Sequence, residues 1–319
     1  MPPGEFELIN RHFVRRGAAR DDVRIGVGDD AAVVAGRAGS EFVLALDTIV
    51  AGVHFPPDLD ARLVGHRVLA VNLSDLAAMG ADPAWALLGL TLPAADERWL
   101  TGFSAGLDAL AHRFDVELVG GDTTRGPLSA TIALAGFVPA GQALRRRGAR
   151  PGDDIWVSGT PGDAGGGLAL LQGRLQASGD ERTELLRRFQ LPEPRVGLGR
   201  LLRGLATACI DVSDGLASDL GKLCDASEVG ADLNSRLVPV SGALRKVAGS
   251  VPAFTIALGA GDDYELLFTA PPTARARIDA LKAGVALRRI GTISPVAGVR
   301  VDGALPERDA GHGFDHFAD

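Results

Sequence analysis

A single acidic residue lies inside an apolar helical pattern, and this feature restricts what the chain can fold into. In the stretch LAVNLSDLAAMGA, residues 69–81, apolar residues recur at helical spacing on both sides of Asp75, and Gly80 ends the helix. A lone buried carboxylate costs roughly several kcal/mol unless a cation, hydrogen-bond donors or a proton compensates it. Because no Lys or Arg occurs between Arg67 and Arg98, a cation from outside the chain is one interpretation.

The remaining sequence alternates apolar runs of strand length with runs of helical period, which predicts a mixed α/β (α+β) fold. Its 319 residues suffice for two domains with separate cores. We expect strands at 23–27, 31–34, 42–46, 85–92, 117–119 and 129–138, and helices at 4–16, 63–79 and 93–113. Further on, we expect strands at 154–157, 209–211, 255–258, 265–269 and 287–293, and helices at 164–176, 181–189, 195–206, 216–224 and 273–283. This pattern predicts an N-terminal mixed-sheet domain over residues 1–138, a Pro- and Gly-rich linker over 139–153 and a C-terminal α/β domain over 154–319.

The charge balance and the cysteines restrict the class of partner and the compartment. A net charge of -7 and a pI near 5.4 argue against a nucleic-acid surface, and no polybasic tail suggests binding to an anionic membrane. The apolar runs are shorter than the roughly 18 residues of a membrane span, and the first residues lack a signal-peptide pattern. Cys209 and Cys224 are the only cysteines and form no known motif, so we expect a reducing cytoplasm.

Any phosphate chemistry in the first two thirds of the chain must do without lysine. The first lysine is Lys222, which excludes a Walker-type loop before it and leaves Arg, backbone amides or a metal ion to contact phosphate. The three arginines at 145–147 are either a solvated connector or a phosphate clamp. Residues 26–31 fit the dinucleotide pattern Gly-x-Gly-x-x-Ala, but we reject this interpretation because Asp29 and Asp30 would lie where a pyrophosphate binds.

Five short motifs share one arrangement, in which a strand or apolar run is followed by Asp beside Gly, Ser or Thr. They are Gly28–Asp30, Asp47–Thr48, Gly120–Thr124, Asp211–Gly215 and Gly261–Glu265. Each motif on its own is a turn or a helix cap more often than a ligand site. Together with Asp75 they indicate carboxylates that converge on one crevice, where divalent cations would relieve their repulsion. Oxygen ligands without Cys partners favour Mg²⁺ over zinc.

Taken together, these motifs resemble the thiamine-monophosphate kinase family of the aminoimidazole ribonucleotide synthetase superfamily. The resemblance runs in order through Glu5–Phe6, Gly28–Ala32, Asp47–Phe55, Asn72–Pro83, Gly120–Thr124, Ile210–Leu216, Gly261–Leu266 and Gly313–Phe317. It implies ATP-dependent phosphorylation of thiamine monophosphate to thiamine diphosphate, assisted by several Mg²⁺ ions, in thiamine diphosphate biosynthesis. It also implies a homodimer whose N-terminal sheets join into an intersubunit barrel.

The resemblance assigns roles to individual residues by their position in these motifs. It implies that Asp30, Asp47, Asp75, Asp122, Asp211 and Asp214 hold magnesium, that Gly121, Asp122, Arg146 and Ser213 contact ATP, and that His54, Asp262 and Phe314 contact the thiamine moiety. No residue is assigned as acid or base, because the acceptor phosphate is already anionic at neutral pH. Two positions depart from the family: Ala45 and Leu46 replace hydroxyl residues, and Asp262 stands where Glu is common. Considered alone, His54 remains a core or surface histidine, and Ser213 a helix cap.

Four alternative functions compete with this interpretation. A selenophosphate synthetase would carry a reactive Cys and Lys near the N-terminus, and a hydrogenase-maturation protein a C-terminal Cys; neither feature is present. An aminoimidazole ribonucleotide synthetase is disfavoured by the motifs at residues 47–55 and 313–317. A non-catalytic nucleotide- or metal-binding module would differ from a kinase in an assay of ADP release with and without thiamine phosphate.

Overall fold

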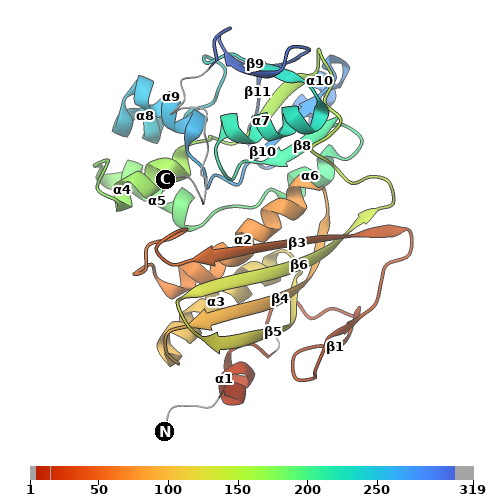
Figure 1. The fold of residues 1–319 in the computed structure, drawn as a ribbon, viewed down its shortest axis with the longest axis vertical. Helices are drawn as coiled ribbons and strands as arrows, with labels where there is room; N and C mark the ends of the chain where they lie inside the picture. Colours follow the sequence, from red (N-terminus) through yellow and green to blue (C-terminus); the bar gives the residue numbers. More distant parts are fainter. Residues whose placement is uncertain (1–4, 15, 306–319) are drawn as a thin grey trace. The chain divides into compact units, whose positions relative to one another are not determined.

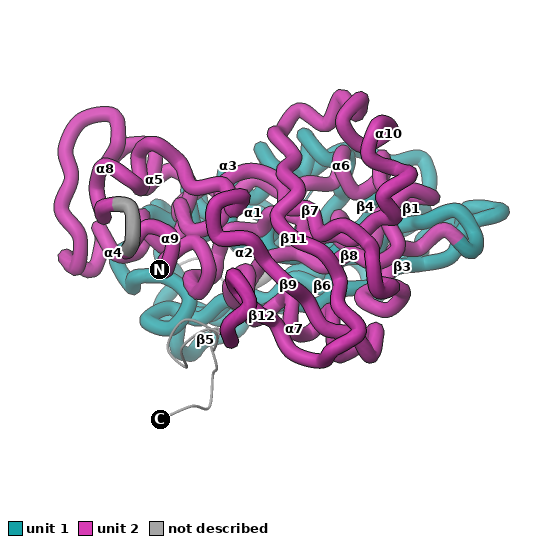
Figure 2. The backbone as a smooth tube through the Cα atoms, turned by 90° about the horizontal axis from the view of Figure 1, so that it is seen from above, with its two compact units in different colours: residues 1–76, 81–141 teal, residues 77–80, 142–319 magenta. Residues whose placement is uncertain are grey.

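The computed structural model describes residues 5–14 and 16–305 and shows two compact units (Figures 1 and 2). Unit 1 comprises Met1–Leu76 and Ala81–Gly141, and unit 2 comprises Ala77–Gly80 and Gln142–Asp319. Both units combine helices with a sheet of mixed strand direction, so the predicted two-domain α/β class is confirmed. None of the described helices is long and apolar enough to cross a membrane.

Unit 1 is built on a four-stranded sheet with the strand order β3-β6-β4-β5. Its strands are β3 (Ser40–Val50), β4 (Asp82–Leu92), β5 (Glu117–Arg125) and β6 (Ser129–Pro139). Helices α2 (Ala61–Ala78) and α3 (Glu97–Arg113) lie on one side of this sheet (Figure 1). The short strands β1 (Val23–Ile25) and β2 (Val33–Val34) pair separately, and α1 (Glu5–His12) precedes them. The predicted elements of this unit are therefore present, with β3 and β5 longer and α1 shorter than expected.

The two faces of the unit 1 sheet differ in how they are covered. Ile132 and Leu134 of β6 face the helices and are buried, as is Leu90 of β4. On the opposite face of β3, Leu44 is 76% exposed and Leu46 is 64% exposed. Side chains alternate between the faces of a strand, so the apolar run that predicted a fully buried strand belongs to a strand that is covered on one face only.

Glycines allow α2 and α3 to approach closely. A methyl group at Gly65 of α2 would lie 2.0 Å from the carbonyl oxygen of Phe103, and one at Gly106 of α3 would lie 1.9 Å from that of Arg62. Backbone therefore packs on backbone at this crossing, which only glycine permits. Helix α3 begins at its cap Asp96, whose side chain accepts the backbone N–H groups of Arg98 and Trp99.

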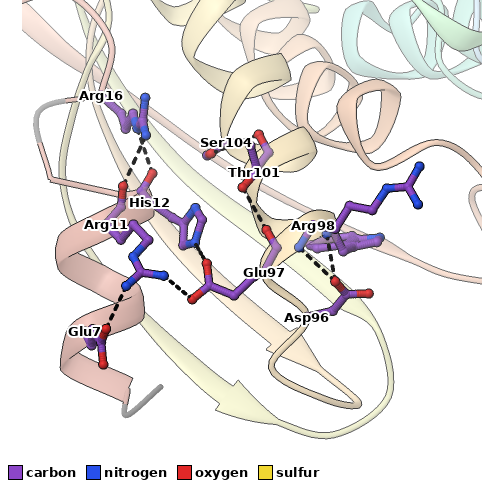
Figure 3. A network of polar contacts seen from close by, with 10 residues as sticks. Glu7, Arg11, His12, Arg16, Asp96, Glu97, Arg98, Thr101 and Ser104 are labelled. Carbon is purple, nitrogen blue, oxygen red and sulfur yellow. Dashed lines mark hydrogen bonds and ion pairs between the residues drawn. The ribbon is translucent and has the colours of Figure 1, made fainter. Parts of the chain in front are cut away.

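Helix α1 is joined to α3 by polar contacts at the surface of unit 1 (Figure 3). The Glu97 carboxylate accepts from Arg11 Nη1 at 2.6 Å and lies 2.9 Å from His12 Nε2. Arg11 also contacts Glu7 one turn away at 2.7 Å, and Arg16 Nε donates to the carbonyl of His12. This set of contacts, the α1–α3 network, ties the first helix to the unit.

Unit 2 is built on a six-stranded sheet with the order β12-β9-β11-β7-β10-β8. Its strands are β7 (Asp154–Ser158), β8 (Ala208–Asp211), β9 (Gly230–Leu233), β10 (Leu266–Ala270), β11 (Leu287–Ser294) and β12 (Gly298–Val301). The helices are α4 (Asp163–Leu171), α5 (Gly179–Gln190), α6 (Val196–Leu202), α7 (Leu216–Ser227), α8 (Gly242–Ala248), α9 (Ser250–Gly259) and α10 (Arg275–Asp279), with a 3-10 turn at Pro272–Ala274. Every residue of β7, β8 and β10 is buried, which explains their unbroken apolar runs.

One predicted element of unit 2 is wrong, and three others went unpredicted. Residues 255–258, expected to be a strand, lie in helix α9, where Ala253 and Ala257 are buried one turn apart. A four-residue apolar run fits a strand and a buried helix equally well, and here the helix forms because it packs on α4 and α7. Strands β9 and β12 and helix α8 are too short to give a periodic signal. The helix expected at 273–283 is limited to α10 and the turn before it.

Candidate functional site

The turn between β8 and α7 carries three of the predicted site residues and is fixed by a carboxylate that was not among them. Asp219, in the first turn of α7, is buried, and its Oδ2 accepts the backbone N–H groups of Ser213 and Asp214 at 2.9 Å and of Gly215 at 3.2 Å. Burial raises the pKa of Asp219, although Lys222 and these amides favour its ionised form. The turn is therefore held from inside, and the half-buried side chains of Ser213 and Asp214 extend from it.

Lys222 supplies a positive charge to the same turn. Its ammonium group donates to Asp219 Oδ1 at 2.7 Å and to a carboxylate oxygen of Asp214. Asp211, at the end of β8, is 5% exposed. A cation of the chain itself therefore lies directly against Asp214.

The loop Gly261–Glu265 lies directly against this turn, so two sequence motifs that are about 50 residues apart meet in space. The backbone N–H of Asp262 donates to the carbonyl of Ser213 at 2.8 Å, and that of Tyr264 to the carbonyl of Val212 at 2.8 Å. A methyl group at Gly261 would lie 2.2 Å from the Ser213 carbonyl oxygen, so this position requires glycine. The structure therefore places the predicted nucleotide residue Ser213 beside the predicted substrate residue Asp262.

The loop has an unusual backbone conformation at two residues. Asp262 has a φ of 69° and Tyr264 a φ of 51°. Left-handed backbone is unfavourable for residues other than glycine, above all for bulky ones, and persists only where surrounding contacts over-determine it. The Tyr264 hydroxyl donates to Asp262 Oδ1 at 3.0 Å, which links the two residues through their side chains as well.

The next carboxylate in the loop, Glu265, is fully buried and paired with two arginines. Arg195 donates from Nε to Oε2 at 2.7 Å and from Nη2 to Oε1 at 2.5 Å, and Arg188 Nη2 donates to Oε1 at 2.5 Å. The Ser158 hydroxyl donates to Oε2 at 2.5 Å. Burial alone would raise the pKa of Glu265, but the hydrogen bonds and charges of Arg195 and Arg188 outweigh it and lower the pKa. We call Glu265, Arg188, Arg195 and Ser158 the Glu265 network.

Asp263 anchors the loop to the start of helix α4. Its Oδ2 accepts the N–H of Gly162 at 2.6 Å and its Oδ1 accepts that of Ala164 at 3.2 Å. Burial raises its pKa well above the usual range for an aspartate. Asp163 lies beside it, also buried, and accepts from Ser241 Oγ at 2.6 Å; burial raises its pKa too. Asp263 and Glu265 thus point into the unit and fix the loop that presents Asp262.

In unit 1, an asparagine brings two predicted metal ligands together. Asn72 is fully buried in α2, and its Oδ1 accepts the backbone N–H of Asp47 in β3 at 2.9 Å while its Nδ2 donates to the carbonyl of Val68 at 2.9 Å. Asp75 follows Asn72 by three residues, so both project from the same side of the helix. Asp47 and Asp75 are both half-buried. Asp75 therefore lies between buried neighbours of α2, as its apolar pattern predicts, and is itself partly exposed.

His54 lies in the turn that follows β3 and is oriented by the backbone. Its Nδ1 accepts the backbone N–H of Val50 at 3.0 Å, and the backbone N–H of His54 donates to the carbonyl of Val50 at 2.9 Å. An Nδ1 that accepts a hydrogen bond belongs to the tautomer with its proton on Nε2. His54 therefore carries its ring proton on Nε2.

Asp122 and Gly121 occupy β5. Residues that pair across neighbouring strands share a sheet face. Asp122 pairs with Gly89 of β4, and Gly89 pairs with Thr131 of β6. Thr131 pairs in turn with Thr48 of β3. Asp122 is therefore on the uncovered face, with Thr48 and Thr131, whose hydroxyls are 2.8 Å apart. A methyl group at Gly121 would lie 2.0 Å from the carbonyl oxygen of Leu88, so strand packing alone requires this glycine.

The remaining predicted residues are less constrained. Asp30 is exposed in the turn after β1 and donates its N–H to Asp29 Oδ1 at 2.8 Å. The Arg146 side chain is exposed, while its carbonyl accepts from Ser227 Oγ at 3.0 Å, so this part of the expected linker is attached to unit 2. Phe314 lies outside the described residues. Among residues 5–14 and 16–305, no three His, Cys, Asp or Glu side chains gather into a group that could hold a metal ion.

Sequence reasoning missed Asp219, Lys222 and the Glu265 network. Asp219 gave a weak signal, since an acidic residue four positions into a helix can cap the preceding turn. Lys222 gave another, as the first lysine in the chain. Arg188 and Arg195 gave none, because they meet Glu265 from 77 and 70 residues away.

Comparison with known proteins finds relatives that match over most of the chain. The family model described as AIR synthase related protein, N-terminal domain, matches residues 28–138, and the corresponding C-terminal domain model matches residues 150–303. Thiamine-monophosphate kinase from Salmonella typhimurium is 47% identical over 325 residues, which cover 100% of this chain and 99% of the relative.

Two solved structures share the fold across nearly the whole chain. A crystal structure of thiamine-monophosphate kinase from Stenotrophomonas maltophilia K279a has a TM-score of 0.86 and 48% identity, covering 90% of this chain and 93% of that one. AaThiL complexed with AMPPCP and TMP has a TM-score of 0.80 and 31% identity, covering 91% of this chain and 92% of that one.

Proposed function

We propose a mechanism on the premise that this chain belongs to the thiamine-monophosphate kinase family. It is a kinase that uses ATP to phosphorylate thiamine monophosphate to thiamine diphosphate, in thiamine biosynthesis. The observation that carries the assignment of its site is the meeting of the turn Asp211–Gly215 with the loop Gly261–Glu265, through the 2.8 Å bond from Asp262 N–H to the Ser213 carbonyl. This contact supports binding of nucleotide and phosphate acceptor side by side.

We propose that the cofactor is magnesium, bound by carboxylates that come from different elements of the chain. The ligands proposed are Asp30, Asp47, Asp75, Asp122, Asp211 and Asp214, all hard oxygen donors. The Lys222 ammonium against Asp214 shows that a positive charge is tolerated at this carboxylate. Magnesium, when bound, would neutralise the charge of the phosphate groups during transfer. The chain's own part is to hold these carboxylates still, which Asn72 does for the strand at Asp47 and Asp219 for the turn at Asp214.

The remaining site residues would orient the two substrates. Phosphoryl transfer depends on alignment and charge stabilisation more than on a covalent nucleophile. We propose that Arg146 and the backbone at Gly121 contact ATP, and that the Nε2–H of His54 donates to the acceptor molecule. Asp262 and Phe314 would face the cationic thiazolium ring. The acceptor phosphate is an anion at neutral pH, so the site needs no general base.

We propose that two copies associate through the uncovered face of the unit 1 sheet, which corresponds to the intersubunit barrel implied by the family. Four apolar side chains on this face are strongly exposed: Phe42 at 56%, Leu44 at 76%, Leu46 at 64% and Leu87 at 46%. A contiguous apolar patch of this kind marks an interaction surface. Leu44→Asp should convert a dimer to a monomer in light scattering, whereas Glu41→Gln on the same strand should not; a monomeric unsubstituted protein would refute the proposal.

The cysteines fit a thiol-independent kinase in a reducing cytoplasm, which we also propose. Cys209 and Cys224 are buried and free. Burial raises the pKa of Cys209, and that of Cys224 to about 12, so neither is a reactive thiolate at neutral pH. This disfavours the alternative enzymes that depend on a reactive cysteine.

The decisive experiment measures ADP release with thiamine monophosphate, with other phosphate esters and without acceptor. We expect release only with thiamine monophosphate and Mg²⁺, and its loss on chelation. Asp47→Ala and Asp75→Ala should abolish turnover with little change in thermal unfolding, whereas the exposed Asp58→Ala should retain it. Near-normal turnover by either variant at modest Mg²⁺ would show that the metal assignment is wrong, and acceptor-independent release would show that the chain is not this kinase.

A further inference from the structure

The loop Gly261–Glu265 is held so rigidly that the direction of one carboxylate is determined in advance. Its backbone is bonded to the turn at Val212 and Ser213, and its buried carboxylates, Asp263 and Glu265, are fixed by two backbone amides and two arginines. These contacts maintain left-handed backbone at Asp262 and Tyr264, which a free loop would not adopt. The loop is therefore preorganised before any ligand binds.

Within this loop, Tyr264 is placed to act on Asp262. Its side chain is largely buried at 9% relative exposure, while Asp262 is half-buried. The hydroxyl donates to Asp262 Oδ1 at 3.0 Å. A carboxylate with one oxygen fixed by a donor has its plane set, and its other oxygen then has a defined direction. Such preorganisation strengthens ligand binding because less side-chain freedom is lost when the ligand arrives.

We propose that Tyr264 is a positioning residue that orients the Asp262 carboxylate toward the cationic ring of the phosphate acceptor, and so contributes to selectivity for that substrate. This inference rests on the proposed function, in which Asp262 contacts the thiamine moiety. Tyr264 itself need not touch the substrate. The short Asp262 side chain depends on its orientation more than a longer one would, because it cannot reach a misplaced partner by changing rotamer.

The kinetic test separates orientation from folding. Tyr264→Phe retains the ring and removes only the hydroxyl, so we expect the KM for thiamine monophosphate to rise roughly five- to tenfold, with the KM for ATP and kcat nearly unchanged. Asp262→Asn should raise the same KM at least as much. In the Asp262→Asn background, Tyr264→Phe should add less than a twofold change, because the two residues act as one. Trp156→Phe, which alters another buried aromatic residue of unit 2, is the control and should leave both KM values unchanged.

A second readout does not depend on turnover. Tyr264 is the only tyrosine in the chain, so protein labelled with ¹³C at tyrosine Cζ gives one resonance that reports on this hydroxyl. We expect thiamine monophosphate to shift it to saturation, and a non-hydrolysable ATP analogue alone to leave it in place. The shift should be lost in Asp262→Asn.

The possible outcomes distinguish the inference from the function on which it rests. Suppose that the unsubstituted protein phosphorylates thiamine monophosphate. If Tyr264→Phe then keeps the same KM for thiamine monophosphate, or if the tyrosine resonance does not shift when this substrate is added, the positioning role is overturned and the kinase assignment stands. If the unsubstituted protein does not phosphorylate thiamine monophosphate, the function fails and the positioning role falls with it.

Discussion

The α1–α3 network of unit 1 and the Glu265 network of unit 2 are both centred on one glutamate but have opposite surroundings. In each, one glutamate lies between two basic side chains: Glu97 between Arg11 and His12, and Glu265 between Arg188 and Arg195. The Glu97 side chain, which Figure 3 shows between Arg11 and His12, is 37% exposed, whereas Glu265 is completely buried. Their distances are nearly equal, so geometry alone does not separate them.

The two networks differ in whether water can solvate the glutamate when it loses a basic partner. Water solvates Glu97 when Arg11 moves away, and such exposed pairs contribute little to stability. Water does not reach Glu265, so loss of one partner leaves a charge without compensation in a medium of low polarity. The buried network therefore determines the position of the loop that carries Asp262, while the exposed network only supports the packing of α1. Four predictions probe this contrast, beginning with the largest effect.

Glu265→Gln should cause the greatest loss of stability. The substitution preserves the shape of the side chain but leaves Arg195 without its counter-charge and Arg188 with only Asp163, 4.0 Å away, which should lower the free energy of unfolding by about 3–5 kcal/mol. Urea unfolding measures this change. Glu184→Gln, at an exposed position on the same helix as Arg188, is the matched control and should be nearly neutral. A loss below 1 kcal/mol for Glu265→Gln would remove the distinction between the two networks.

Gly159→Ala tests how tightly the Glu265 network is packed. Gly159 has a φ of +63°, and a methyl group there would lie 2.0 Å from Glu265 Oε1. Left-handed strain costs about 1–2 kcal/mol and overpacking about 1–3 kcal/mol more. Gly284 has a φ of +69° with open space around it, so Gly284→Ala should show the strain alone. Urea unfolding measures the loss of unfolding free energy in both variants. Equal losses would mean that the Glu265 network rearranges to make room for the methyl group.

The buried acids beside the network should give a pH dependence of defined sign. The pKa of Asp163 is raised in the folded protein above its usual 3.8, mainly by burial, so the folded state holds this proton more tightly than the unfolded state. Its stabilising effect is complete below pH 3.8 and is lost as the pH rises through the folded-state pKa. The unfolding free energy of the unsubstituted protein minus that of Asp163→Asn should therefore fall across this window and then level off. A difference that rose with pH would contradict the direction of the shift.

Arg11→Ala should have the smallest effect. Arg11 is half exposed and pairs with exposed carboxylates, so its loss should scarcely move the midpoint of thermal unfolding. The pKa of Glu97 is lowered, first by its hydrogen bond with His12, so its contribution is present above its ordinary value of 4.5 and is lost as the pH falls through the folded value. Any effect of Arg11→Ala should also vanish in 1 M salt. A change as large as that of Glu265→Gln would show that exposure does not decide the strength of these pairs.

The same contrast explains how much of the molecule could be predicted from its sequence. Strands such as β4 and β6 are long and regularly patterned, so their periodicity predicts them, and the motif turns at Asp211 and Gly261 are visible from their Asp and Gly residues. The orientation of each carboxylate in Gly261–Glu265 could not be predicted. Asp262 is half-buried while Asp263 and Glu265 point into the unit, because folding brings Arg188 and Arg195 to Glu265. The spacing of these residues in the sequence does not predict that contact.

The uncovered face of the unit 1 sheet has a consequence for the newly synthesised chain. Strand β3 stands at the end of the strand order, spans eleven residues and carries Phe42, Leu44 and Leu46 on its bare side. An edge strand of this length and character is a template for aggregation. On the proposed association of two copies through this face, a second copy would have to reach the strand before an unrelated chain does. The yield of native enzyme should then depend on how quickly two copies meet, and a polar substitution at Leu44 should weaken their association while it increases solubility.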